Sequence, residues 1–159
     1  DETVHVAILE DADVIYVAKV DSTHAVRMVS AAGRRLPAHC TAVGKMLLAM
    51  LPRDVLDERI PPDTPLAGMT EHSITSPTVL REHLAEMRTR GIAVEDRESN
   101  PDVHCVAAPV RDSSGAVVAA LSISVPTVRW DEERTPELER LAVKGAADLS
   151  ARLGHRGRP

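Results

Sequence analysis

The segment VHCVAAPVRDSSGAVVAALSIS, residues 103–124, places one thiol and two hydroxyl groups on two strand-like runs. Its middle, DSSG at 112–115, is typical of a tight turn, because Asp and Ser bond their own backbone and Gly tolerates positive φ. A loop of two or four residues pairs Cys105 with Ser122, and strand alternation then puts Cys105, Ser122 and Ser124 on one face. The sequence predicts a β-hairpin with a shallow, weakly polar floor.

The hairpin's two faces differ in character. In the expected register the floor is completed by small or apolar residues and includes Val118, whereas Val117 belongs to the opposite, core-facing side. A loop of three residues would shift the pairing by one position and exchange these sets. Small residues on a floor leave room for a ligand, but they also let a helix pack closely, and the pattern alone does not separate the two.

A helix start supplies a second set of polar groups. Thr41 is of the residue type that caps helices, and the sequence predicts a helix over 42–51 that Pro52 closes. The first N–H groups of such a helix, from Ala42, Val43 and Gly44, lie at the positive end of the helix dipole. Together with the serine hydroxyls, these groups predict a seat for a carboxylate in a small, mostly apolar cavity.

Two His-Cys pairs raise the alternatives of a metal site and a cysteine enzyme. His39-Cys40 and His104-Cys105, with the acidic residues at 95 and 96, offer zinc-type side chains, but not at the usual CxxC or HxxxH spacing. Adjacent strand residues such as His104 and Cys105 face opposite ways, so they cannot chelate one ion together. A nucleophilic Cys105 would need a neighbouring base, which its expected neighbours do not provide. Both alternatives stay open behind the ligand-binding interpretation, and we expect neither a metal nor a cofactor.

The elements that must position these residues alternate strands with helices. Apolar patterns predict a hairpin over 3–22, a strand over 25–31, a loop over 33–37 and a strand over 92–96. Helices are expected over 42–51, 53–60, 77–90 and 135–153, the third opening on Ser76-Pro77 and closing at Gly91. The last should bury a stripe of leucines and alanine. That stripe comprises Leu138, Leu141, Ala142, Leu149 and Leu153. This order predicts an α+β fold with one mainly antiparallel sheet.

Composition limits the class of protein. The 159 residues carry a net charge of −5, with 43% hydrophobic and 27% charged residues. An acidic chain of this kind has no electrostatic reason to bind nucleic acid or an anionic membrane by itself. No run is long enough to span a bilayer, and two cysteines without a disulfide spacing indicate a reducing cytoplasm. The basic tail over 155–159 is expected to be disordered.

Three segments together resemble the effector-binding domain of IclR-type bacterial transcriptional regulators. The motifs are H-x-x-A-x-G-K at 39–45, R-G-x-A-x-x-D at 90–96, and C-V-A-A-P-V-x-D at 105–112 followed by a strand ending in S-x-S. The resemblance covers nearly the whole chain. It implies a GAF-like domain over 1–154, with a curved antiparallel sheet and helices packed on it, that is not an enzyme. It also implies self-association to a dimer or tetramer. DNA binding would occur only through a winged helix-turn-helix that is absent from this chain.

The same resemblance implies a binding site for a small organic acid. Its acidic position falls on either Glu95 or Asp96, and both are kept. The implied effector-binding residues are Met28, Ala42, Val43, Glu95, Asp96, Cys105, Ser122 and Ser124. His104 and Cys40 are not positions that the motifs require, so they would adjust ligand choice or serve a metal.

Overall fold

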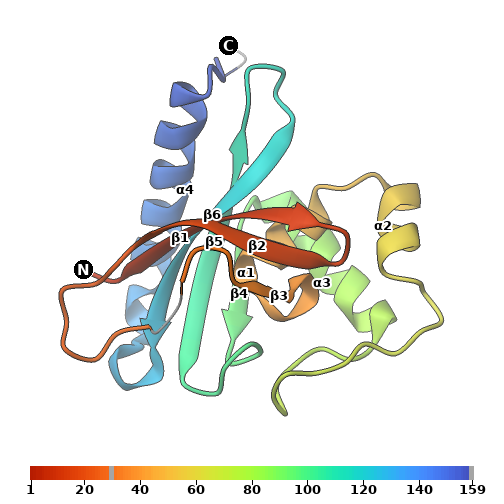
Figure 1. Ribbon diagram of the computed structural model, residues 1–159, viewed down its shortest axis with the longest axis horizontal. Coiled ribbons are helices and arrows are strands. Elements are labelled where there is room, and N and C mark those ends of the chain that lie inside the picture. The colour runs from red at the N-terminus through yellow and green to blue at the C-terminus, as the bar shows by residue number, and fades with distance from the viewer. Residues whose placement is uncertain (29–30, 158–159) are drawn as a thin grey trace.

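A curled antiparallel sheet organises the computed structural model, which describes residues 1–28 and 31–157. Within these residues six strands pair in the order β3-β2-β1-β6-β5-β4 (Figure 1). The strands are β1 (Thr3–Glu10), β2 (Asp13–Val20), β3 (Arg35–Pro37), β4 (Ala93–Asp96), β5 (Val103–Arg111) and β6 (Val117–Pro126). The curl makes a half-barrel, and the predicted α+β class with helices on an antiparallel sheet is confirmed.

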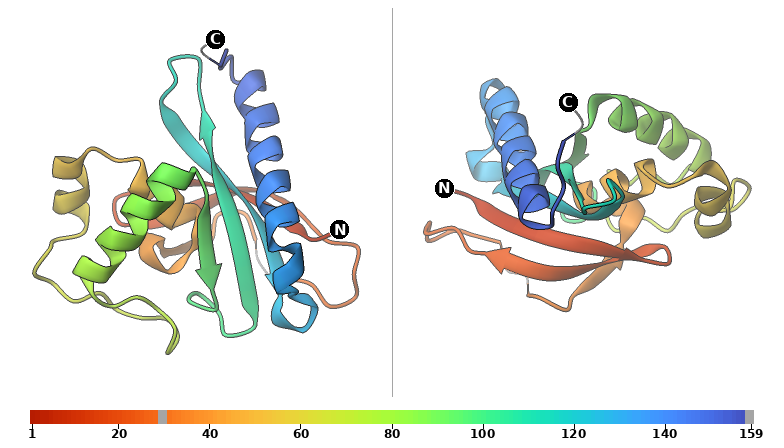
Figure 2. Two further views of the ribbon diagram at one scale, coloured as in Figure 1. Left: turned by 180° about the vertical axis from the view of Figure 1, so that it is seen from behind. Right: turned by 90° about the horizontal axis from the view of Figure 1, so that it is seen from above.

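The helices lie on both faces of the sheet. They are α1 (Ala42–Ala49), α2 (Arg53–Arg59), α3 (Pro77–Arg90) and α4 (Thr135–Arg152), with short 3₁₀ turns at Ala38–Cys40, Thr127–Arg129 and Glu132–Arg134. Figure 2 shows α4 on one side of the β5–β6 hairpin and the α1–α3 pair on the other. In the described part of the chain, no helix has the length and apolar character to cross a membrane.

Alternation along β5 divides the core in two. Val106, Ala108 and Val110 pack with α4, whereas Cys105 and Ala107 pack with α1 and α3. Every residue of α1 is buried, including its lysine, so this helix is the centre of the second cluster. The thiol face of the hairpin is therefore covered along part of its length by helix side chains, as the close-packing alternative expects.

The β5–β6 hairpin corrects the predicted register. Asp112 N–H donates to Ala116 O at 3.0 Å, which leaves a three-residue loop with Gly115 at φ +85°. Arg111 faces Val117 but Val110 faces Ala119, so Val118 is the extra residue of a β-bulge.

This bulge restores the alternation that the odd loop would have inverted. Cys105 consequently lies opposite Ser124 rather than Ser122, although all three share a face as predicted. Val117 and Val118 were assigned to the wrong sides: Val117 packs with the α1 cluster and Val118 is 39% exposed.

Other element predictions need smaller corrections. No strand forms at the described positions of 25–31, residues 29–30 lying outside the description, and the expected loop at 33–37 contains β3. Leu141 of α4 and Leu153, just past its end, are exposed, whereas Ala146 and Ser150 of α4 are buried. The tail prediction lies partly outside the described residues, since only 155–157 are described; His155 N–H donates to Ser150 O at 2.9 Å.

Candidate functional site

A row of four polar side chains crosses the sheet on the face opposite α4. The strand pairing places Thr3 of β1 opposite Ser124 of β6, Ser124 opposite Cys105 of β5, and Cys105 opposite Glu95 of β4. All four are buried, the most exposed being Cys105 at 8%. Buried polar groups are normally hydrogen-bonded, and here Thr3 and Glu95 accept backbone N–H groups, so this row forms a polar strip across this face of the sheet.

Hydrogen bonds connect part of this row to the next one. The Cys105 thiol donates to Ser124 Oγ at 3.2 Å, and Ser124 Oγ lies 3.3 Å from His5 Nδ1. The His5 ring is 5.0 Å from the Tyr16 ring, tilted by 56°. Burial lowers the pKa of His5 to about 4 and raises the pKa of the Cys105 thiol well above its ordinary value. The network is therefore uncharged at neutral pH.

A cavity of about 260 Å³ opens over one end of this network. Its floor is Cys105 and Ser124, and its wall includes His5 and Tyr16. Its cover comes from residues 26–28, from Arg34 and Leu36 at β3, and from the β4–β5 turn. The lining residues are His5, Tyr16, Val26, Arg27, Met28, Arg34, Leu36, Ser99, Asn100, Asp102, Val103, Cys105, Ser124 and Pro126. The mixed apolar and polar lining is typical of a small-ligand site.

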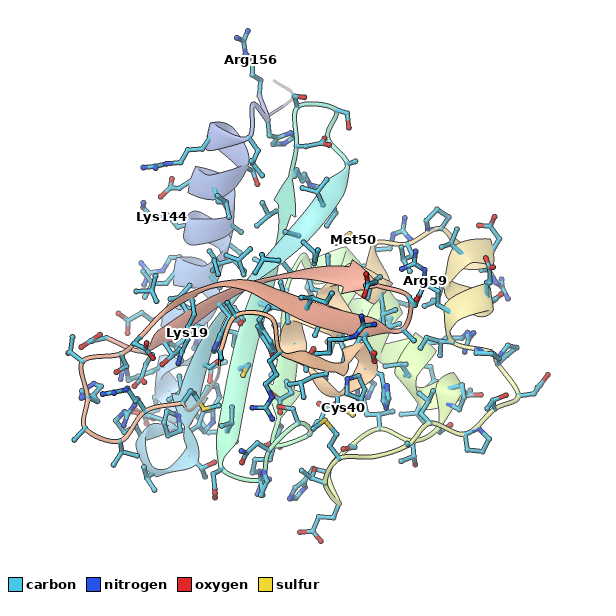
Figure 3. The ribbon with its side chains drawn as sticks, viewed as in Figure 1. Lys19, Cys40, Met50, Arg59, Lys144 and Arg156 are labelled. Carbon is cyan, nitrogen blue, oxygen red and sulfur yellow. The ribbon has the colours of Figure 1, made fainter. Side chains whose placement is uncertain are left out.

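Two guanidinium groups stand at this cavity. Among the described residues, neither Arg27 nor Arg34 forms an ion pair with a carboxylate, whereas the neighbouring Arg35 pairs with Glu10 and Asp13. The segment that carries Arg27 is tethered, because Lys19 of β2, labelled in Figure 3, donates to Met28 O at 3.1 Å. The cavity therefore has cations available to an anionic ligand.

Glu95 lies beneath this site as a fully buried carboxyl group. Its Oε1 accepts the backbone N–H of Glu98 at 2.7 Å and of Ser99 at 3.0 Å, which fixes the turn that leaves β4. Its Oε2 meets no hydrogen-bond donor in normal geometry among the described residues, and the carboxyl group lies beside the Cys105 thiol. Burial raises the pKa of Glu95 to about 7. Lys45, which acts to lower this pKa, forms its ion pair with Glu98.

The start of α1 serves packing more than its sequence suggested. Thr41 caps the helix as predicted, but its Oγ1 accepts the Gly44 N–H at 3.0 Å and so removes one of the three expected donors. A Cβ at Gly44 would lie 2.2 Å from Ala38 O, so glycine lets the 3₁₀ turn approach the helix closely. Ala42 and Val43 are each 1% exposed within the core cluster.

The structure brings together some of the predicted site residues and separates others. Met28, Cys105 and Ser124 line the cavity. Ser122 is buried one row away, opposite His5, and does not line it.

The two acidic candidates separate by face. Glu95 shares the face of Cys105, whereas Asp96 points to the other side of the sheet and pairs with His104 at 3.2 Å.

Sequence reasoning missed the residues that come from the first strands. His5 and Tyr16 belong to the β1–β2 hairpin, and Arg34 and Leu36 flank or form β3. A histidine and a tyrosine on strands were visible in the sequence. Nothing local, however, indicated that β1 would pair with β6 and so place them beside Ser124.

The His-Cys pairs form no common site. His104 stacks on Trp130 at 4.5 Å on the α4 side, while His39 Nε2 lies 2.9 Å from Ala67 O. Cys40, labelled in Figure 3, is fully buried. Within residues 1–28 and 31–157, no three His, Cys, Asp or Glu side chains are grouped so as to hold a metal ion.

Comparison with known proteins agrees with this arrangement. The family model described as the bacterial transcriptional regulator IclR C-terminal domain matches residues 1–151. The transcriptional regulator KdgR of Escherichia coli K12 is 37% identical over 99% of the chain, which spans 60% of that relative's length. The crystal structure of the E. coli KdgR C-terminal domain superposes with a TM-score of 0.84 at 35% identity, covering 97% of this chain and 88% of that one.

A second solved structure is a complex with a small acid. The inducer-binding domain of a PobR double mutant from Acinetobacter, in complex with 3-hydroxybenzoic acid, has a TM-score of 0.82 at 28% identity, covering 94% of this chain and 87% of that chain.

The fold and the cavity thus define a regulatory α+β domain of the effector-binding class. The chain belongs to the IclR family of bacterial transcriptional regulators, in which it corresponds to the C-terminal, effector-binding domain. The relatives are regulators rather than enzymes, which confirms that part of the sequence interpretation.

Proposed function

We propose that the domain senses a small organic anion, most simply a carboxylic acid, in the 260 Å³ cavity. The observation that carries the proposal is a neutral hydroxyl–thiol floor, Ser124 and Cys105, in the same cavity as Arg27 and Arg34. Among the described residues, neither arginine forms an ion pair with a carboxylate. A guanidinium binds a carboxylate through parallel hydrogen bonds, and the floor gives hydroxyl donors and acceptors to the rest of the ligand. The acid complex of the PobR domain supports this ligand class by similarity.

The cavity volume limits the size of the effector. Sites for drug-sized ligands usually measure about 300–1,000 Å³, so a cavity of this volume suits a compact acid. Ser99, Asn100 and Asp102 at the mouth provide further polar contacts for hydroxyl or keto groups. In this proposal Glu95 does not contact the ligand but supports Cys105 and the 98–99 turn. Ser122, Ala42 and Val43 shape the core around the cavity.

The signal would reach DNA through a winged helix-turn-helix outside this chain. Ligand binding changes the populations of domain states only if one state binds better, and the cover formed by residues 26–28, Arg34 and Leu36 is the part of the cavity that would differ between states. A dimer or tetramer of the whole regulator, acting in the cytoplasm, completes the proposal. Asp96 is left out of the site because it lies on the α4 side of the sheet.

Thermal unfolding with a panel of acids tests this proposal. Acetate, lactate, gluconate and 3-hydroxybenzoate are compared with their uncharged amides. An acid at one hundred times its Kd should stabilise the domain by about 2.7 kcal/mol, and its amide should not.

Two variants localise the effect on the cavity. Arg34→Gln should raise the Kd of the acid by about tenfold and so reduce the stabilisation that the acid produces. Arg140→Gln, at an exposed position, is the matched control. Ser124→Leu should fill the cavity and abolish the shift. Stabilisation that is equal with the amides, or unchanged in Ser124→Leu, would refute the assignment.

A further inference from the structure

A second cavity, of about 670 Å³, lies at the other end of the β5–β6 hairpin. It is bounded by the end of β1, the C-terminal end of α1, α2, α3 and the bulged part of the hairpin. Met50 and Arg59 mark this side of the molecule in Figure 3. The lining residues are Leu9, Leu47, Met50, Leu51, Pro52, Arg59, Arg88, Arg111, Gly115, Ala116, Val117 and Val118. None of them lines the effector cavity.

The floor of the second cavity is apolar. Leu47 and Val117 belong to the edge of the α1 core cluster, and Met50 and Leu51 continue that cluster past the end of the helix. Val118 is turned outward by the bulge and is 39% exposed. Leu47 is buried and Met50, Leu51 and Val117 are half-buried, so part of this apolar surface stays accessible and would be stabilised by contact with the body of a ligand.

Three arginines from three different elements stand around this floor. Each donates one Nη1–H to a backbone carbonyl: Arg59 to Asp11 O at 3.1 Å, Arg88 to Leu51 O at 3.2 Å and Arg111 to Gly115 O at 2.9 Å. These bonds hold the guanidinium groups in place while their remaining N–H donors stay available.

Among the described residues, the side chains that line this cavity include basic but no acidic ones. The lining contains no Asp or Glu, and among the described residues none of the three arginines forms an ion pair. Three of the nearby carboxylates are engaged elsewhere: Glu10 and Asp13 pair with Arg35, and Asp112 accepts hydrogen bonds from Ser114. In a chain of net charge −5, three free cations over an apolar floor are an unusual concentration of positive charge.

We propose that this cavity is a second ligand site, for an amphipathic organic anion that has an apolar body and a carboxylate, sulfonate or phosphate group. The body would rest on Leu47, Met50 and Val117, and the anionic group would be held by Arg88 and Arg111, with Arg59 closing the far side. The volume lies within the usual range for small-molecule sites. This site is independent of the effector cavity.

The probe 8-anilino-1-naphthalenesulfonate tests the proposal, because it combines an aromatic body with one sulfonate and fluoresces in apolar surroundings. The folded domain should bind one equivalent with a measurable Kd, and the uncharged N-phenyl-1-naphthylamine should bind at least about tenfold more weakly. The triple variant Arg59→Gln/Arg88→Gln/Arg111→Gln should raise the Kd by at least about tenfold, and Arg88→Gln alone by about threefold. Arg88 is exposed, so this single variant keeps the test valid if the triple variant does not fold.

A matched control separates a local site from a general charge effect. Arg53→Gln/Arg140→Gln/Arg152→Gln makes the same change of net charge at exposed positions outside the cavity and should leave the Kd unchanged. Ser124→Leu, which fills the effector cavity, should also leave it unchanged. The proposal is overturned if the probe does not saturate, if Arg88→Gln and the triple variant bind it as the wild type does, or if the control triple variant weakens binding equally. Loss of binding in Ser124→Leu would place the probe in the effector cavity and would also overturn it.

Discussion

Replacing Glu95 with glutamine should stabilise the domain at pH 8 and leave its stability nearly unchanged at pH 4. Glu95 is 0% exposed, and its burial raises its pKa from 4.5 to about 7. Glutamine keeps an oxygen that can accept the N–H groups of Glu98 and Ser99, so the backbone contacts of the turn are retained. The variant therefore removes the ionisation and keeps the structure.

The direction of the pH effect follows from proton binding. Below pH 4.5 the carboxyl group is protonated in both the folded and the unfolded chain, so its contribution is constant. Between pH 4.5 and 7 the folded state holds a proton that the unfolded state releases, and stability falls as the pH rises. Above pH 7 the full penalty applies, and a pKa difference of this size corresponds to about 3 kcal/mol.

Urea unfolding of both proteins at pH 4, 5.5 and 8 measures this difference. The free-energy gain of Glu95→Gln should grow from near zero to about 3 kcal/mol, and its largest change should lie between pH 4.5 and 7. Glu82→Gln, at an exposed position of α3, is the control and should show a small effect at every pH. A gain that does not change with pH, or a wild type more stable than the variant at pH 8, would refute the reasoning.

Three further predictions concern other buried groups. Gly44→Ala should destabilise the domain by about 2 kcal/mol or more, because its Cβ would lie 2.2 Å from a backbone oxygen. Gly145→Ala, whose Cβ meets only side-chain atoms at 3.4 Å or more, should be neutral or stabilising by up to about 1 kcal/mol. Equal unfolding midpoints for the two variants would contradict this prediction. Lys45→Met should lower the free energy of unfolding by about 3 kcal/mol, because it leaves the buried Glu98 without its cation. Lys45→Met/Glu98→Leu should recover part of that loss in urea unfolding. A double variant that is destabilised by the sum of the two single effects would contradict the prediction. Relative to His5→Gln, the wild type should lose stability as the pH falls from 6.5 to about 4, because burial depresses the pKa of the folded histidine; parallel pH profiles would exclude this.

Local signals in the sequence predict most elements of this fold. Ser76-Pro77 and Gly91 bound α3, and Thr41 caps α1, because capping depends on side chains within a few residues. The strands at 3–10 and 13–20 follow from their apolar patterns. The strand expected at 25–31 did not form at its described positions, since a β-type composition yields a strand only where a neighbouring strand offers pairing.

The candidate site was predictable only in part. Cys105 and Ser124 are predicted from alternation within one hairpin and from the family resemblance, and both line the cavity. His5 and Arg34 reach it because β1 pairs with β6 and because a long segment folds back over the sheet. Such contacts join residues far apart in the chain, and no periodicity within a window of the sequence reports them.

The bulge at Val118 offsets the one-residue shift in pairing that the three-residue loop introduces. The odd loop and the extra residue each advance the pairing by one place, and together they return every later side chain to its face. Deleting Val118 alone would turn Leu121 and Ile123 to the sheet face that carries Cys105, and would turn the hydroxyl groups of Ser122 and Ser124 toward α4. Deleting one loop residue as well would return these side chains to their original faces. The hairpin therefore keeps its two faces only when its length changes by two residues.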